Sequence, residues 1–340
     1  MRPIRAAAVA VLLGLLGAAC EVANPSAGER LQPSMVAPEQ FAALKTANDV
    51  PYGPGVAEVL DVYAPANRNG GAILWIHGGG WADANGDPNS LASEEPLGMQ
   101  PVVMGLYQRG WTVFSVRYAG TDEAPFPAQI HDVKLAMRWV RKNAATYGVA
   151  PDSVVAMGWS AGGHLAALLG VSSGLLEPTG VPRDLQKVSS RPAAAVSLAG
   201  VLDPATFAFT PGLGIGNGAG ITALLGCPAT PDRWNTCSRR LLESTRTTNY
   251  DDRRDPPLYI AQGNRDGVVD PYWQAQVPYA SMVKVMGDEK VWLDMVDTGD
   301  AAPYGEDPRN HTKALSYELN WSALLNFVDR LLPAVLPPVR

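Results

Sequence analysis

The chain has 340 residues, of which 46% are hydrophobic and 18% are charged, and its formal net charge is −6. This length and composition are sufficient for one large hydrophobic core, and the sequence contains no internal repeat or block of like charge. The excess of acidic residues argues against a nucleic-acid partner, because polyanions are bound by clustered lysine and arginine side chains.

The N-terminus has the pattern of an export signal over residues 1–19. Arg2 and Arg5 precede an apolar run, Val9–Leu16, which is followed by small residues and is too short to span a bilayer comfortably. Cys20 then stands where a bacterial lipoprotein signal carries its lipidated cysteine. We expect an exported protein anchored to the membrane through a lipid on Cys20, on the extracytoplasmic side. Secretion or a periplasmic location without a lipid is the alternative.

Residues 20–50 mix proline, serine, alanine and glutamate without a period, and we interpret them as a tether and leading segment. Residues 51–340 form the expected domain. Seven apolar runs predict strands: 58–63, 72–77, 111–118, 153–157, 193–198, 257–261 and 290–296. Three segments predict helices: 128–147, 161–171 and 312–332. This alternation predicts an α/β fold, with a mostly parallel sheet of about eight strands and helices on both faces.

One long segment, about residues 202–255, lies between two predicted strands and holds many glycine, proline and threonine residues. Insertions of this length are usually functional or mobile, so we predict a small irregular lid or pocket wall. A surface excursion without a role is the alternative.

Two cysteines, Cys227 and Cys237, lie within this insertion. In an oxidising compartment two nearby thiols are expected to form a disulfide. The alternative is a pair of free thiols. A zinc site is not expected, because two thiols without a nearby histidine are too few ligands.

The pentapeptide Gly158-Trp159-Ser160-Ala161-Gly162 has the pattern of a nucleophilic serine. A hydrolytic serine stands on a sharp turn between a strand and a helix, and glycines two residues before and after it permit that turn. The context fits, since an apolar strand precedes the motif and a predicted helix follows it. The N-terminal amides of that helix would point at the reacting centre. The pattern therefore predicts Ser160 as the nucleophile.

A second motif, His77-Gly78-Gly79-Gly80-Trp81, follows a predicted strand. We call these five residues the glycine loop. Three glycines let the backbone approach a substrate and turn its N–H groups toward a developing oxyanion. The amide of Ala161 would supply a further donor. A simple glycine turn is the alternative, whereas a phosphate-binding loop is disfavoured because no Gly-Lys-Ser/Thr follows.

The base is chosen by elimination among four histidines. His77 belongs to the glycine loop, and His131 lies on an amphipathic helix, where a structural role is expected. His164 lies one turn beyond Ser160 on the same helix, and its side chain is expected to point away from the nucleophile. His311 lies between the last strand and the last helix, where a triad histidine falls in this chain order. We therefore predict His311 as the base.

The acidic member of a triad is expected after the predicted strand 257–261. Asp266, with Gly267 beside it, fits a tight turn that holds a carboxylate toward the histidine. Asp270 precedes Pro271 and would simply cap the next helix, with proline at its first position. Asp266 is the preferred assignment.

Together these motifs resemble the α/β-hydrolase superfamily over most of residues 50–335. The resemblance is to carboxylesterases with His-Gly-Gly-Gly-Trp and Gly-x-Ser-Ala-Gly-Gly motifs, which include hormone-sensitive-lipase-like, acetyl-xylan/feruloyl-esterase-like and kynurenine-formamidase-like proteins. It implies the α/β-hydrolase fold and a triad of Ser160, Asp266 and His311. It also implies the oxyanion donors Gly79, Gly80 and Ala161, with Gly78 as a further candidate.

These features predict hydrolysis of a small-molecule carboxylic ester through an acyl-enzyme on Ser160, with no metal and no organic cofactor. Three alternatives remain. An arylformamidase would use the same residues on an amide-like bond, and a peptidase on this fold would usually carry a large extra domain. A non-catalytic binding protein derived from a hydrolase would need none of these residues.

Overall fold

The computed structural model describes residues 43–82, 100–207, 217–227, 237–297 and 321–332. All described residues belong to one compact unit of the chain. Several predicted features lie outside the described residues: the signal segment 1–19, Cys20, the tether up to residue 42, and His311. No helix among the described residues is both long and apolar enough to span a bilayer.

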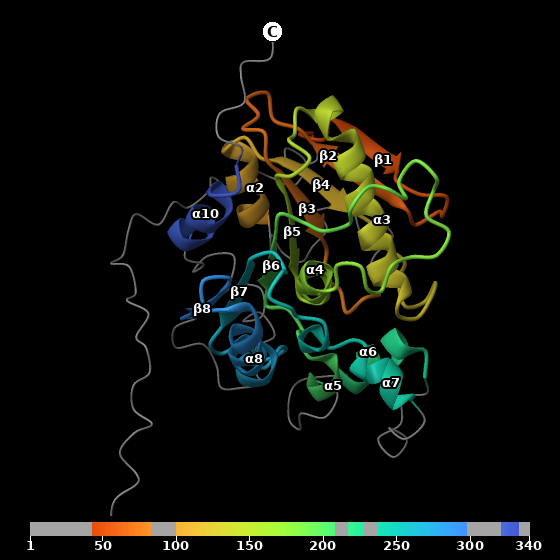
Figure 1. Ribbon diagram of the computed structural model, residues 1–340, viewed down its shortest axis with the longest axis vertical. Helices are drawn as coiled ribbons and strands as arrows, with labels where there is room; N and C mark the ends of the chain where they lie inside the picture. The colour runs from red at the N-terminus through yellow and green to blue at the C-terminus, as the bar shows by residue number, and fades with distance from the viewer. Residues whose placement is uncertain (1–42, 83–99, 208–216, 228–236, 298–320, 333–340) are drawn as a thin grey trace, which may run out of the picture. The chain divides into compact units, whose positions relative to one another are not determined.

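The central feature is an eight-stranded sheet with the order β1-β2-β4-β3-β5-β6-β7-β8 (Figure 1). Strands β3 to β8 are paired in parallel, whereas β1 and β2 join antiparallel at one edge. The strands are β1 Ala47–Pro51, β2 Val59–Tyr63, β3 Ala72–Ile76, β4 Thr112–Val116, β5 Val154–Trp159, β6 Ala194–Leu198, β7 Leu258–Gly263 and β8 Val291–Val296. The predicted mostly parallel sheet of about eight strands is therefore confirmed.

Successive residues of a strand point to opposite faces of the sheet. The strands of this sheet carry apolar residues on both faces, and helices cover both. On one face, Leu74 packs in a cluster with residues of α3 and α4, and α8 packs against the β7 and β8 part of that face. On the other face, Trp75 packs with residues of α2 and α10. Figure 1 shows α2 and α10 together, apart from α3 and α4. These helices are α2 Gln100–Gln108, α3 Ala128–Asn143, α4 Ala161–Val171, α8 Val277–Met286 and α10 Trp321–Asp329.

Two expected features differ from the structure. The boundary expected at residue 50 falls inside β1, because Ala47–Pro51 pairs with β2. The described part of the insertion 202–255 is not irregular. It contains α5 Pro204–Phe207, α6 Asn217–Leu225, α7 Arg239–Glu243 and a 3₁₀ turn, Thr247–Asn249. The elements α5 and α7 and the 3₁₀ turn are too short to leave a helical period, and the sequence of α6 contains glycine and threonine, which weaken a helical signal.

The insertion is packed onto the domain rather than standing away from it. Ile221 and Leu224 are buried in the same cluster as α3 and α4, and the carbonyl of Leu224 accepts a hydrogen bond from the amide of Phe126 at 2.7 Å. Cys227 and Cys237 form a disulfide with their Cα atoms 5.6 Å apart. A loop of this size contributes on the order of 2–3 kcal/mol to stability.

Candidate active site

The carboxyl ends of β3, β5 and β7 lie along one edge of the sheet and lead into the predicted site residues. Strands β3 and β5 are parallel neighbours, with Ile76 opposite Gly158, so the glycine loop and the serine turn begin side by side. Strand β7 lies two strands from β5, across β6, and the loop that holds Asp266 follows it. Ligands of open α/β sheets bind at this edge.

Ser160 stands on the turn that joins β5 to α4. Its backbone has φ 55° and ψ −120°, a conformation that is strained for serine and that a sharp strand-to-helix turn requires. Its amide donates to the carbonyl of Leu198 at 2.9 Å, which ties the turn to the end of β6. Ser160 is partly exposed, whereas every residue of α4 is buried. The turn therefore leaves Ser160 accessible at the start of a buried helix.

The two glycines of the serine motif are required by close packing against the end of β3. A Cβ added to Gly158 would lie 2.7 Å from the Ile76 carbonyl oxygen, and one added to Gly162 would lie 2.6 Å from the Ile76 carbonyl carbon. Real Cβ atoms essentially never approach this closely. Small residues here bring the start of α4 directly against the strand that leads into the glycine loop.

The glycine loop contains three consecutive residues with positive φ. The angles are 95° at Gly79, 65° at Gly80 and 63° at Trp81. Gly79 and Gly80 are exposed, whereas Trp81 is buried. Among the described residues, no backbone carbonyl accepts from the amides of Gly79, Gly80 or Ala161. Ala161 opens α4, where the first amides of a helix have no partner within the helix. These N–H groups can therefore receive an anionic oxygen.

Tyr118 supports this loop from the end of β4, a contact that the sequence motifs did not indicate. Its hydroxyl donates to the carbonyl of His77 at 3.0 Å, and its ring stacks on the His77 imidazole with centroids 4.3 Å apart and an interplanar angle of 10°. Nδ1 of His77 lies 2.9 Å from the Gly78 carbonyl oxygen, so Nδ1 carries the proton in that bond. His77 therefore shapes the start of the loop.

Asp266 is fully buried in the loop after β7. One carboxylate oxygen accepts from the amides of Val268 and Val269, at 2.8 and 2.9 Å. The other accepts from the side-chain amide of Gln262 at 2.9 Å. Together these three donors fix the orientation of the carboxylate. Gln262 is a further residue that the motifs did not indicate, since its role depends on the path of the loop.

Asp270 has a different role from Asp266. Its carboxylate accepts from the amide of Trp273 at 2.8 Å, at the start of the helical segment that runs from Tyr272–Gln276 into α8. This is the helix cap that the sequence allowed for Asp270. Of the two acids, Asp266 is thus the one whose carboxylate is held by the loop itself.

Three of the four histidines lie in the described part of the chain, and two of them form hydrogen bonds with residues other than Ser160. His77 lies in the glycine loop. His131 is half-buried on α3, where burial and the nearby Lys134 lower its pKa. His164 is fully buried, accepts a hydrogen bond from the indole of Trp81 at 3.1 Å and donates one to the carbonyl of Thr245 at 2.8 Å.

Burial lowers the pKa of His164 from 6.5 to about 4, against smaller opposing effects of the Thr245 hydrogen bond and the Asp203 charge. Because the folded state favours the neutral ring, the contribution of His164 to stability is complete above its unfolded pKa of about 6.5 and is lost as the pH falls through about 4. This contribution amounts to about 3 kcal/mol.

We therefore expect His164→Leu to reduce the pH dependence of folding. The free energy of unfolding of the wild type should exceed that of the variant by less at about pH 4 than at about pH 7, measured by urea titration at both values. A difference between the two proteins that does not change with pH would contradict this prediction.

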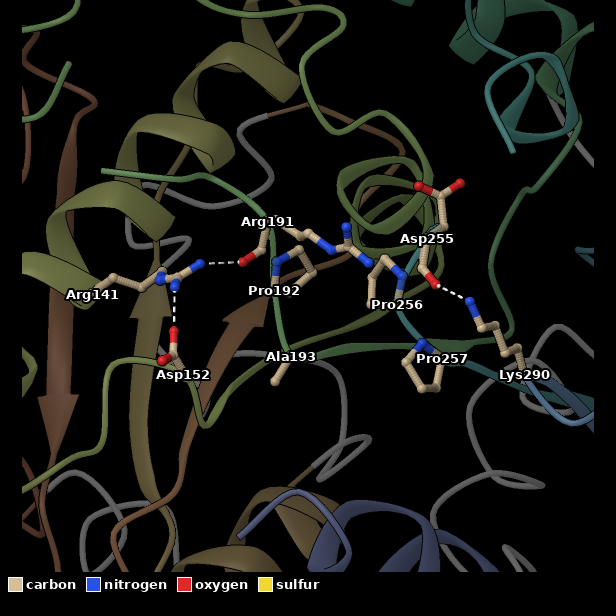
Figure 2. Close-up of a pocket in the computed structure, with 9 residues that line it drawn as sticks. All are labelled: Arg141, Asp152, Arg191, Pro192, Ala193, Asp255, Pro256, Pro257 and Lys290. Atoms are coloured by element: carbon tan, nitrogen blue, oxygen red, sulfur yellow. Dashed lines mark hydrogen bonds and ion pairs between the residues drawn. The ribbon is translucent and has the colours of Figure 1, made fainter. Parts of the chain in front are cut away.

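No group of three or more histidine, cysteine or acidic side chains in the described ranges is arranged to hold a metal ion. The described residues do contain a pocket of about 370 Å³, shown in Figure 2, but it lies at the opposite edge of the sheet. Its lining comes from the residues that precede β5, β6, β7 and β8, and from α3: Arg141, Asp152, Arg191, Pro192, Ala193, Asp255, Pro256, Pro257 and Lys290.

Several residues that line this pocket are hydrogen-bonded to one another. Arg141 donates to the Asp152 carboxylate and to the Arg191 carbonyl, each at 2.6 Å. Lys290 donates to the Asp255 carbonyl at 3.2 Å. Figure 2 shows these bonds bridging the strand starts. They link residues at the amino edge of the sheet, and the lining of the pocket includes no serine or histidine. The candidate active site is therefore the opposite, carboxyl edge.

Comparison with known proteins identifies one family model and several relatives. The family model BD-FAE matches residues 60–280. Esterase LipQ of Mycobacterium tuberculosis is 35% identical over 147 residues, which are 42% of this chain and 32% of that protein. Carboxylesterase NlhH of the same organism is 31% identical over 144 residues, which are 41% of this chain and 42% of that protein. The matched part thus spans less than half of either relative.

Solved structures match over more of the chain. A truncated carbohydrate esterase from gut microbiota superposes with a TM-score of 0.65 at 24% identity, covering 84% of this chain and 95% of that one. Esterase 2 of Thermogutta terrifontis superposes with a TM-score of 0.55 at 23% identity, covering 81% of this chain and 90% of that one. At such identities the likeness concerns the fold.

Proposed function

Because the chain belongs to the BD-FAE family and has the α/β-hydrolase fold, we propose that it hydrolyses carboxylic esters as a serine esterase. The observation that carries this proposal is the strained turn at Ser160, with φ 55°, set beside the Gly79 and Gly80 amides, which lack carbonyl partners among the described residues. A nucleophile and an oxyanion site at one sheet edge are the two parts that acyl transfer requires. The esterase names of the relatives support the same reaction.

In the proposed mechanism His311 takes the proton of the Ser160 hydroxyl, and the serine oxygen attacks the ester carbonyl carbon. The tetrahedral intermediate collapses, its bond to the alcohol oxygen breaks, and the alcohol leaves with the proton from His311. Water then gives its proton to His311 and attacks the acyl-enzyme, which releases the acid and restores Ser160. Asp266 accepts a hydrogen bond from His311, orients the ring and stabilises its cation.

The oxyanion of each tetrahedral intermediate is held by the amides of Gly79, Gly80 and Ala161. Donors that are already oriented need no rearrangement when the charge develops, and one such donor typically contributes about 3–4 kcal/mol to lowering the barrier. The first amides of α4 also lie at the positive end of the helix dipole, which favours the same charge.

The test combines turnover with covalent labelling. We expect the protein to hydrolyse short-chain aryl esters and a fluorophosphonate probe to modify Ser160, as identified by peptide mass spectrometry. Comparison of formyl-kynurenine with an acetyl ester in the same assay distinguishes an esterase from an arylformamidase. Failure of the probe to label Ser160, together with no turnover of any ester, would instead support a non-catalytic binding protein.

A further inference from the structure

The buried ring of His164 joins three segments that are distant in the sequence. It lies on α4, four residues after Ser160, and is fully buried. The Trp81 indole N–H donates to its Nδ1 at 3.1 Å, and its Nε2 donates to the Thr245 carbonyl at 2.8 Å. The first partner ends the glycine loop, and the second belongs to the insertion between β6 and β7.

These partners define the protonation of the ring. A carbonyl oxygen such as that of Thr245 can only accept, so Nε2 carries the hydrogen, and an indole N–H can only donate, so Nδ1 carries none. Both nitrogens of neutral His164 are therefore occupied. The ring is not available to exchange a proton with Ser160, and its role must be exercised through Trp81 or Thr245.

Trp81 is the residue through which His164 acts on the candidate site. Its φ of 63° lies in the left-handed region that a bulky side chain rarely adopts, and it continues the positive φ angles of Gly79 and Gly80. Trp81 is 2% exposed, and its ring meets the imidazole edge-on, with centroids 5.5 Å apart. A conformation of this kind persists only when surrounding contacts hold it.

The hydrogen bond between Trp81 and His164 connects the two parts of the candidate oxyanion site, the glycine loop and the start of α4. Ala161 and His164 lie on the same helix, whose residues are all buried, so their relative positions are fixed. Trp81 directly follows Gly80. The hydrogen bond from Trp81 to His164 therefore sets where the amides of Gly79 and Gly80 lie relative to the amide of Ala161.

We propose that His164 is a positioning residue that holds the glycine loop in register with the start of α4 through its hydrogen bond to Trp81. The proposal rests on the esterase function proposed above. Transition-state stabilisation depends on donors lying at hydrogen-bond distance from the position that the oxyanion will occupy. Loosening the loop should therefore weaken binding of the transition state more than binding of the substrate.

Trp81→Phe is the main test, since it keeps a large aromatic ring and removes the indole donor. We expect kcat for a short aryl ester to fall by about 10- to 100-fold while KM changes by less than about threefold. The affinity for a boronic acid, which mimics the tetrahedral intermediate, should fall in parallel with kcat. Rates are normalised to the fraction of protein that a fluorophosphonate probe titrates, so that misfolded protein is not counted.

Trp111→Phe is the matched control. Trp111 is also fully buried, its indole nitrogen has no hydrogen-bond partner within the described ranges, and it directly precedes β4, at the edge of the sheet opposite the site. This variant makes the same change of side chain and should keep the kcat and boronic acid affinity of the wild type. A Trp81→Phe variant that behaves like Trp111→Phe, or that raises KM with kcat unchanged, would overturn the proposal.

Substitutions of His164 test whether both residues act through one hydrogen bond. His164→Leu should lower kcat as Trp81→Phe does, and the double variant should lose little more than either single variant, because a shared interaction is lost only once. His164→Gln, which retains a donor and an acceptor, should recover part of kcat. Fully additive losses would contradict the proposal. If the wild type has neither turnover nor labelling at Ser160, the proposed function fails first and this inference fails with it.

Discussion

Replacement of Ser160 by alanine should lower kcat for a short aryl ester by about 10⁴- to 10⁶-fold. The substitution removes the hydroxyl that forms the acyl-enzyme, whereas the glycine loop and the rest of the site stay in place. Residual turnover above that of buffer is expected, because amides that hold an oxyanion still assist direct attack by water. The measurement is steady-state hydrolysis at saturating ester, together with loss of fluorophosphonate labelling.

The matched control for this variant is Ser153→Ala. Ser153 is buried and directly precedes β5, at the opposite end of the strand that leads to Ser160. This control should keep the kcat of the wild type. Both variants should keep the wild-type far-UV circular dichroism, since neither removes a large apolar group. Retained turnover in Ser160→Ala, or an equal loss in Ser153→Ala, would rule out Ser160 as the nucleophile.

Replacement of Asp266 by asparagine should lower kcat by about 10⁴-fold. The present carboxylate accepts hydrogen bonds from two backbone amides and from Gln262. An asparagine amide can match this set with only one oxygen, so its NH₂ group meets another donor or faces the position that the triad histidine would occupy. The histidine then loses its acceptor and the stabilisation of its cation, while Ser160 and the oxyanion amides remain.

Asp270→Asn is the control, because it makes the same chemical change four residues away. The Asp270 carboxylate caps the segment that starts at Tyr272, and asparagine is an equally good cap. Its kcat and melting temperature should match those of the wild type. If Asp270→Asn lowered kcat as much as Asp266→Asn, or if only Asp270→Asn did so, the proposed assignment of the acid would be wrong. Steady-state kinetics and thermal unfolding distinguish these outcomes.

The core strands were predictable because they are buried on both faces. β3, β5 and β7 are continuous apolar runs bounded by glycine or polar loops, and that pattern survives in a single sequence. β1, Ala47–Pro51, was missed for the opposite reason. It is an antiparallel edge strand whose residues are all exposed or half-buried, so its sequence carries no apolar signal.

Helices, like strands, were predictable where burial leaves an apolar pattern in the sequence. α4 was predicted with its observed bounds, Ala161–Val171, because it is apolar throughout and is fixed at its start by the serine motif. The elements of the insertion were not predicted. α5 and α7 have four and five residues, too few for a helical period, and their positions depend on packing against the domain.

The sequence by itself determined the motifs that define the chemistry, since glycines around Ser160 and in the loop after β3 are local requirements of backbone geometry. It also determined the alternation that builds the sheet, because burial imposes apolar periodicity on each element. Only the tertiary structure decided which side chains hold these motifs in place. His164 meets Trp81 and Thr245 across 83 and 81 residues, and Tyr118 meets His77 across 41. Such contacts leave no local pattern, because they depend on which strand ends the folded sheet brings together.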